Sequence, residues 1–218
     1  MPHDSGNAPT GIDPLAAGTQ NVRDVARWRK EMRGRLLAAR QTMPVAAHRA
    51  AGAAVAAHMR DLIGAHPGGA RGAVLSAYWP IRGEPDLRPL MDELHRQGVI
   101  IALPIVETKS APLVFRRWTP ETRMVRGDWN IPVPPRTATR LSPDIALAPL
   151  VGWAPGGWRL GYGGGYFDRT LASLTPRPAT IGVGHRAARL ATIHPQPHDI
   201  PLDVIVTERG VTDNHRQR

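Results

Sequence analysis

The chain has 218 residues, 42% of them hydrophobic, which is enough to bury a substantial core and predicts one domain. No stretch approaches the ~18 consecutive apolar residues of a membrane-spanning helix, and the N-terminus lacks the charged-then-apolar pattern of a signal peptide. The chain has no cysteine, which excludes a disulfide framework and a thiolate zinc site. We therefore expect a cytoplasmic protein that does not associate with membranes.

The formal net charge of +10 raises the question of nucleic-acid binding, because basic surfaces attract phosphate polymers. Lys30 and Lys109 are the only lysines, so nearly all of the positive charge is arginine. The arginines are scattered along the chain, without a run of five or more. This distribution favours a solvated surface, with phosphate ligands or nucleic acid as the alternatives.

The N-terminal half predicts two long helices and then a strand, a helix and a strand. Apolar positions at helical spacing predict a helix over residues 21–43, and a second helix has Pro44 in its first turn and runs to Ile63. Residues 73–79 predict a buried strand, residues 84–98 a helix closed by Gly98, and residues 99–104 the next strand. A helix between two strands implies that these strands pair in parallel.

The C-terminal half predicts shorter elements around a glycine-rich loop. We expect strands over residues 113–118, 144–150, 179–184 and 203–208, and a helix over residues 167–174, directly after the loop. Residues 128–135 contain three prolines and predict an extended loop. We expect one α/β domain over residues 20–210, a mainly parallel sheet with helices on both faces. Residues 1–19, rich in small and turn residues, predict a disordered tail, and residues 211–218 a C-terminal tail.

The glycine-rich loop lies within the sequence GWRLGYGGGYFDRTL, residues 157–171. Four glycines in five positions allow positive φ and a close approach of backbone N–H groups to a ligand, and a following helix would place those groups where anions bind. A tight structural turn is the alternative. No lysine follows, as a Walker loop requires, and Tyr166 stands where the dinucleotide pattern needs glycine. Arg159 and Arg169 could neutralise phosphates.

Three carboxylates near expected turns are candidates for the same site. Asp168, directly after the loop, suits magnesium, which accepts one or two carboxylates and shares its shell with phosphates; capping of the following helix is the alternative. Asp203 could be a second carboxylate, although an ordinary turn aspartate is favoured by the residue pattern alone. Glu84 falls between a strand and a helix, where a ligand contact and a helix cap are equally good interpretations.

Aromatic and histidine residues give weaker signals. Trp79 and Trp129 are more often core residues than ligand-stacking ones. His194 and His198 have a metal-like separation, but the sequence HPQPH is broken by prolines and cannot form one helical face, so metal binding there is not favoured.

Together these motifs resemble the 5-formyltetrahydrofolate cyclo-ligase family, also called 5,10-methenyltetrahydrofolate synthetase. The loop RLGYGGGYFDR is similar to the family signature Arg-Leu-Gly-x-Gly-x-Gly-Tyr-Tyr-Asp, with Phe167 in place of the second tyrosine. Further landmarks follow in the family's order, namely RKEMRGRL, YWPIRGEPD, WNIPVP and HDIPLDVIVTE. The resemblance spans residues 25–208.

The resemblance implies an ATP-driven, magnesium-dependent closure of 5-formyltetrahydrofolate to 5,10-methenyltetrahydrofolate, with release of ADP and phosphate. The formyl oxygen is a poor leaving group, so it is first phosphorylated, and a neighbouring folate nitrogen then attacks the activated carbon. Catalysis of this kind depends on positioning and charge neutralisation.

The resemblance also implies roles for individual residues. Trp79 and Glu84 match substrate-contact positions, and Asp168 and Asp203 match the magnesium positions. The ATP-binding positions correspond to Arg29, Lys30, Arg33, Arg159, Leu160, Gly161, Tyr162, Gly163, Gly164, Gly165, Tyr166 and Phe167. The substrate-binding positions also include Tyr162, Gly163, Gly164, Gly165 and Tyr166.

A different class of function is an arginine-rich RNA- or phosphate-binding module without catalysis. The stacking motifs of the common RNA modules are missing from the sequence, which favours the enzyme. We therefore expect a small-molecule folate substrate, no nucleic-acid partner, and a monomer, with a homodimer as the alternative.

Overall fold

The structure is a computed structural model that describes residues 22–65 and 70–214. Its main element is an eight-stranded sheet in the order β12-β11-β10-β7-β1-β2-β3-β6. The five strands from β11 to β2 are parallel, and β12, β3 and β6 pair antiparallel at the two sides. The strands span Val74–Ser76 (β1), Ile100–Ile105 (β2), Val114–Trp118 (β3), Arg140–Leu141 (β6), Ile145–Pro149 (β7), Ala179–Val183 (β10), Val204–Thr207 (β11) and Gly210–Asp213 (β12).

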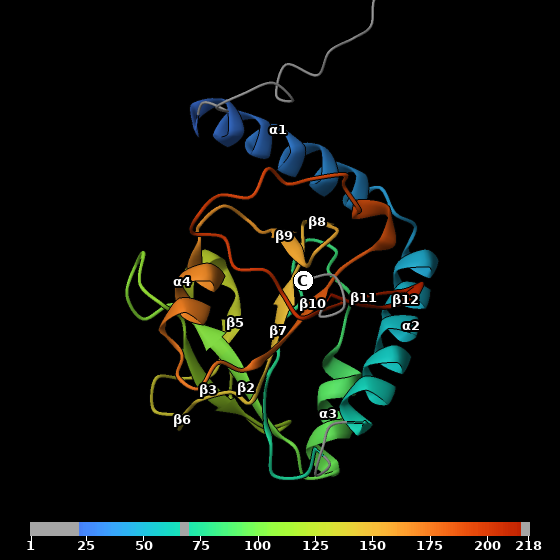
Figure 1. Ribbon diagram of the computed structural model, residues 1–218. Coiled ribbons are helices and arrows are strands. Elements are labelled where there is room, and N and C mark those ends of the chain that lie inside the picture. Colours follow the sequence, from blue (N-terminus) through green and yellow to red (C-terminus); the bar gives the residue numbers. More distant parts are fainter. Residues whose placement is uncertain (1–21, 66–69, 215–218) are drawn as a thin grey trace, which may run out of the picture.

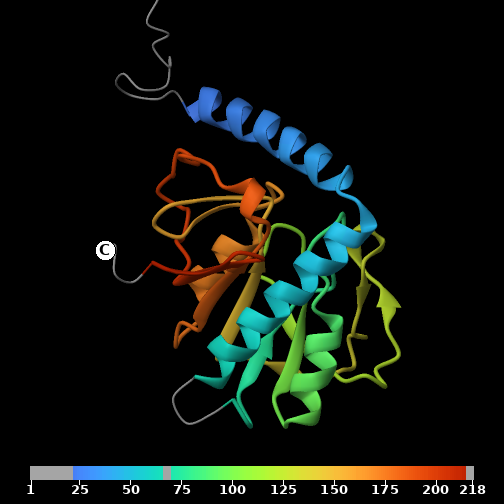
Figure 2. The same ribbon diagram turned by 90° about the vertical axis from the view of Figure 1, so that its right-hand side faces the viewer.

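Helices cover both faces of this sheet, as expected. Helices α2 (Val45–Gly64) and α3 (Arg88–Arg96) lie on one face, and α4 (Tyr166–Ser173) lies on the other (Figure 1). Helix α1 (Val22–Gln41) does not cover a face; it crosses the end of the sheet where the central strands finish (Figures 1 and 2). Ligands of open α/β sheets generally bind at this carboxyl end.

Strand β7 shows how one sheet supports two cores. Successive side chains of a strand point to opposite faces. Ile145 and Leu147 pack in the larger core with α2 and α3, whereas Ala146 and Ala148 pack in the smaller core with α4. All four are buried, which explains why the sequence shows a continuous apolar run here rather than an alternating pattern.

The two longest stretches of helical periodicity have different partners. Helix α2 buries Val55, Met59 and Ile63, which are four residues apart, against the sheet. Helix α1 buries Val25 and Arg29, and its partly buried Met32 and Leu36 pack on the β8–β9 hairpin rather than on the main sheet. A polar residue on the buried side of α1 indicates that this helix also contributes to a site.

Several short elements were not expected from the sequence. Strands β4 (Val125–Arg126) and β5 (Pro132–Val133) pair around a 3-10 turn, η1 (Asp128–Asn130), where we expected only a loop. Strands β8 (Gly152–Ala154) and β9 (Trp158–Leu160) form a second hairpin, and η2 (Arg186–Ala188) follows β10.

The expected C-terminal boundary is also revised. Strand β12 pairs with β11 through Asp213, so the sheet extends past the expected domain end at residue 210, and residues 211–213 are not a tail. The expected N-terminal tail, residues 1–19, lies outside the described residues. None of the helices in the described ranges is both long and apolar enough to cross a membrane.

Candidate active site

A cavity of about 570 Å³ opens at the carboxyl ends of the central strands, under α1. Its walls come from α1, the segment 78–84 after β1, the end of β2, the β4–β5 hairpin and the glycine-rich loop. The expected site residues that line it are Arg29, Arg33, Trp79, Glu84, Arg159, Leu160, Gly161, Tyr162, Gly163, Gly164, Gly165, Tyr166, Phe167 and Asp168. Lys30 is exposed on the outer side of α1, and neither it nor Asp203 lines the cavity.

The glycine-rich loop leads directly into α4. Gly163 has φ +99° and Gly165, the residue before the helix, has φ +62°, conformations that L side chains rarely adopt. A Cβ at Gly163 would lie 3.3 Å from the guanidinium carbon of Arg33. Within the described part of the chain, no hydrogen bond occupies the backbone N–H groups of Gly163, Gly164 or Gly165. These N–H groups at a helix start form a site suited to an anion.

Two arginines hold this loop by its carbonyl groups. Arg33 Nε donates to the carbonyl oxygen of Gly161 at 2.7 Å, and Arg169 donates to that of Gly164. Burial, and then the charge of Arg29, lowers the pKa of Arg33. An anion beside Arg33 would offset both effects, so the electrostatics of the cavity favour a negatively charged ligand.

Glu84 lines the cavity and lies in a hydrogen-bonded chain with Tyr162 and Arg40. The Glu84 carboxylate is buried; it accepts the N–H of Ile81 at 2.9 Å and the hydroxyl of Tyr162 at 2.6 Å. That hydroxyl accepts from Arg40 Nη2 at 2.7 Å. Burial raises the pKa of Glu84, and burial together with Glu84 raises that of Tyr162 well above its usual range. Glu84 does not cap α3, which begins at Arg88.

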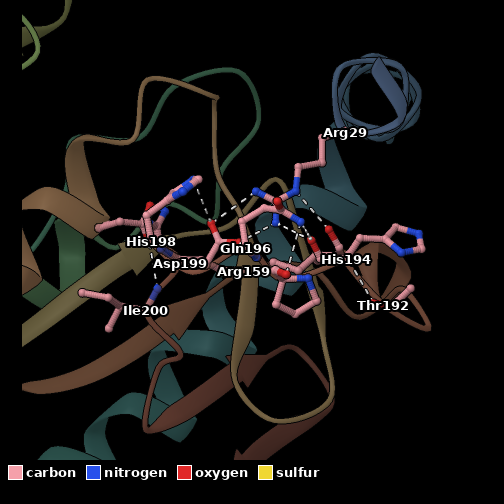
Figure 3. Close-up of polar contacts among 11 residues, drawn as sticks. Arg29, Arg159, Thr192, His194, Gln196, His198, Asp199 and Ile200 are labelled. Atoms are coloured by element: carbon pink, nitrogen blue, oxygen red, sulfur yellow. Dashed lines mark hydrogen bonds and ion pairs between the residues drawn. The ribbon is translucent and has the colours of Figure 1, made fainter. Parts of the chain in front are cut away.

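Arg29 has a different role from its neighbour Arg33. Figure 3 shows its side chain reaching from α1 to the segment 193–199. Nε donates to the carbonyl oxygen of Ile193 at 3.0 Å, Nη2 to that of His194 at 2.9 Å, and both terminal nitrogens contact the Asp199 carboxylate. Arg29 therefore binds a loop of the protein with most of its donors, although it lines the cavity.

Asp168 forms a buried ion pair with Arg159. Arg159 Nη2 donates to the carboxylate at 2.7 Å, and the N–H of Ile200 donates to its other oxygen at 3.2 Å. Asp168 makes no capping hydrogen bond at the start of α4, so the helix-cap alternative is not observed. Arg159 Nε is buried without a hydrogen-bond partner among the residues that the structure describes. Arg159, which we expected to neutralise phosphates, therefore also has a structural role, because it holds the Asp168 carboxylate.

The two expected magnesium ligands lie at different places. Asp203 precedes β11, at the amino end of the parallel strands, and its carboxylate accepts the N–H and hydroxyl of Thr180 at 2.9 and 2.7 Å. Over the ranges that the structure describes, no group of three His, Asp or Glu side chains could hold a metal ion by itself. A carboxylate offers about four lone-pair sites, and Asp168 uses two in the cavity wall. Asp168 therefore fits a magnesium ion that phosphates and water also coordinate.

Two tryptophans also line the cavity. Trp79 is partly buried in the larger core and stacks under the Arg88 guanidinium, 5.3 Å from the ring centre. Trp129 is 68% exposed and meets Tyr166 edge-on at 5.7 Å, so the core position favoured from the sequence is wrong for Trp129. Trp129 has φ +54° in the proline-rich hairpin and lines the cavity.

Sequence reasoning missed Arg40 and Asp199. Both contact residues more than 100 positions away, so local pattern gives no indication of their partners. The signal that could have found Arg40 is its helical spacing from Arg29, Arg33 and Leu36 on one side of α1.

Comparisons with known proteins agree with this architecture. The family model described as the 5-formyltetrahydrofolate cyclo-ligase family matches residues 25–208. The 5-formyltetrahydrofolate cyclo-ligase of Escherichia coli (strain K12) is 32% identical over 135 residues, which are 59% of this chain and 74% of that protein. The protein of the same name from Mycolicibacterium smegmatis is 30% identical over 149 residues, 64% of this chain and 76% of that protein.

Solved structures show the same fold. The NMR structure of Aquifex aeolicus 5,10-methenyltetrahydrofolate synthetase has a TM-score of 0.73 and 27% identity, and the match covers 86% of this chain and 93% of that one. A 5,10-methenyltetrahydrofolate synthetase from Mycoplasma pneumoniae, at 19% identity and a TM-score of 0.67, supports the fold alone. The protein is thus an enzyme of the ligase class. The chain belongs to the 5-formyltetrahydrofolate cyclo-ligase family.

Proposed function

We propose that this enzyme closes 5-formyltetrahydrofolate to 5,10-methenyltetrahydrofolate in the cavity under α1, with one ATP converted to ADP and phosphate. The proposal rests on the backbone N–H groups of Gly163 to Gly165, which line that cavity at the start of α4 and make no hydrogen bond to any residue that the structure describes. Such groups suit the phosphates of ATP. Membership of the family supports the folate as the second substrate.

The proposed chemistry has two steps. The formyl oxygen attacks the terminal phosphoryl group, the bond to ADP breaks, and a formyl-phosphate adduct forms. The second folate nitrogen then attacks the formyl carbon and loses its proton, and the carbon–oxygen bond breaks to release phosphate. In the first step a weak nucleophile attacks an anionic phosphoryl group, and in the second a phosphate anion leaves. Positioning and charge neutralisation therefore supply most of the acceleration.

The residues of the chain divide between the two substrates. Arg33 and the glycine N–H groups lie on the same side and would hold the phosphates. Trp79, Trp129 and Glu84 also line the cavity and would hold the folate ring by stacking and hydrogen bonding. Tyr162, at 36% exposure, hydrogen-bonds to Glu84 from the loop itself and so joins the two regions.

Magnesium would add charge neutralisation at the phosphates when bound. Asp168 is the residue that we propose as its protein ligand, because its carboxylate keeps lone pairs beyond the two used in the cavity wall. The Arg159 pair fixes the orientation of this carboxylate before any substrate binds.

The test is the rise of the methenyl product's ultraviolet absorbance when the purified enzyme receives 5-formyltetrahydrofolate and MgATP. We expect the rise only when both substrates and magnesium are present, with one ADP per product. Lys30→Ala is a control variant that should keep the wild-type rate, because Lys30 is exposed on α1 outside the cavity. ATP hydrolysis without product, or phosphate-polymer binding without turnover, would contradict the proposal.

A further inference from the structure

A second cavity, of about 390 Å³, lies beside η2 and the turn between β11 and β12. It shares no lining residue with the cavity under α1. Three of its nine lining residues are arginines: Arg186, Arg189 and Arg209. These arginines take no part in the proposed chemistry, so the reaction does not explain the positive charge of this cavity.

Two of these arginines are held on a tryptophan. The guanidinium carbons of Arg186 and Arg189 lie 5.8 and 5.7 Å from the Trp153 ring centre, within the range of a cation–π contact. Trp153 is only 3% exposed, and its indole N–H donates to the carbonyl oxygen of His185 at 3.2 Å. The Trp153 carbonyl accepts the N–H of Leu190 at 2.7 Å. The arginines therefore stand on a fixed, buried support.

Several arginines elsewhere in the protein are paired with carboxylates. Arg29, Arg116 and Arg159 form buried ion pairs, and Arg60, Arg88 and Arg96 form pairs at the surface. In contrast, over residues 22–65 and 70–214 no carboxylate forms an ion pair with Arg186, Arg189 or Arg209. Glu208 is the acidic residue on the adjoining turn, and it accepts the backbone N–H of Arg186 at 2.9 Å. Three arginines therefore line the cavity, and the adjoining turn carries one carboxylate.

The cavity also offers a hydroxyl group. Thr207 is 4% exposed and lines the cavity, and its oxygen accepts the N–H of Arg209 at 3.3 Å. A hydroxyl that accepts one hydrogen bond keeps its own proton to donate. The cavity thus combines guanidinium groups with a buried donor.

We propose that this second cavity binds a phosphate group of a small molecule. A phosphate has three terminal acceptor oxygens and up to two negative charges, which match several guanidinium forks, whereas one carboxylate fills one fork. The three arginines are exposed around an open cavity whose volume of about 390 Å³ fits a small ligand. An RNA strand would need an extended basic stripe. The inference does not depend on the proposed reaction, because the two cavities have separate linings.

The test follows the arginine side-chain N–H signals by NMR while inorganic phosphate is added to the full chain. Sodium chloride at equal ionic strength is the control for screening, and succinate tests carboxylates. We expect the Arg186, Arg189 and Arg209 signals to shift together and to saturate with phosphate, at least about tenfold more tightly than with succinate. Equal shifts with chloride, or tighter binding of succinate, would overturn the proposal.

A variant pair then locates the binding. Arg186→Gln combined with Arg209→Gln should weaken phosphate binding, read from the Arg189 signal, at least about tenfold, while the surface pair Arg60→Gln and Arg96→Gln should leave it unchanged. Trp153 keeps its packing in both variants, so the melting temperature should stay close to that of the wild type. Phosphate affinity that is insensitive to the first pair would contradict the site.

Discussion

Two loops meet the underside of α1, and an arginine from that helix holds each of them. Arg29 binds the segment 193–199 through two carbonyl groups and the Asp199 carboxylate, so that its charge is neutralised inside the protein. Arg33, four residues later, binds the glycine-rich loop through one carbonyl group, and none of the described carboxylates forms an ion pair with it. The same residue type on one helical face thus stabilises the fold at one position and remains available to a ligand at the next.

The largest expected effect comes from filling the glycine loop. Gly163→Val should lower kcat/KM about 10²–10³-fold, because a branched side chain disfavours positive φ and would press on Arg33. Steady-state kinetics and a thermal melt measure the effect. We expect the fold to persist, since Gly163 is exposed and outside the core. Normal ATP binding by the folded variant, measured by calorimetry, would show that the loop is only a structural turn.

Asp168 and Asp203, the two carboxylates expected to bind magnesium, lie at different places and should respond differently to substitution. Asp168→Asn should lower turnover about a hundredfold and also lower the melting temperature, because Arg159 loses its charged partner in a buried site. Asp203→Asn should leave the dependence of the rate on magnesium within about twofold of the wild type, because Asp203 lies outside the cavity. An equal change of the magnesium dependence in both variants would contradict the assignment of the metal to Asp168 alone.

Single substitutions of Arg29 and Arg33 test the difference between the two arginines of α1 directly. Arg33→Ala should raise the KM for ATP about tenfold, or ~1.4 kcal/mol, with little change in melting temperature. Arg29→Ala should instead destabilise the fold by about 3 kcal/mol, because it leaves Asp199 buried without its partner. Chemical denaturation and ATP kinetics on both variants measure the two effects. The division of roles is wrong if the stability loss falls on Arg33 and the KM change on Arg29.

The smallest expected effect is a pH dependence. Burial acts to raise the pKa of Asp199, but hydrogen bonds from Arg29 and the Gln196 N–H outweigh it and hold the pKa below its ordinary value. The resulting stability is fully present above the ordinary aspartate pKa of about 4 and is lost as the pH falls through the lowered value. Asp199→Asn should therefore flatten the acid side of the stability profile more than Asp92→Asn does. Asp92 is the control because its ion pair with Arg96 lies at the surface. Parallel profiles for the two variants would contradict this.

Local sequence patterns predicted the central fold because its strands are apolar runs and its helices have helical periodicity. The short edge elements, such as β6, β8 and β12, contain two to four residues and depend on partners that local pattern does not specify. The glycine loop was predictable because glycines at this density destabilise helices and strands and are typical of turns and ligand-binding loops. The Arg29–Asp199 and Arg40–Tyr162 contacts were not predictable, because both depend on how α1 crosses the end of the sheet.

We propose above all that the N–H groups of the glycine loop, which bind none of the described residues, bind the phosphates of ATP. Backbone amide NMR of the full chain, titrated with MgATP, tests it most directly. We predict that the amide signals of Gly163, Gly164 and Gly165 show the largest shifts and saturate together, while the amide of Thr180, beside Asp203, stays in place. Saturable shifts confined to other parts of the chain, with these three glycines unchanged, would contradict the account.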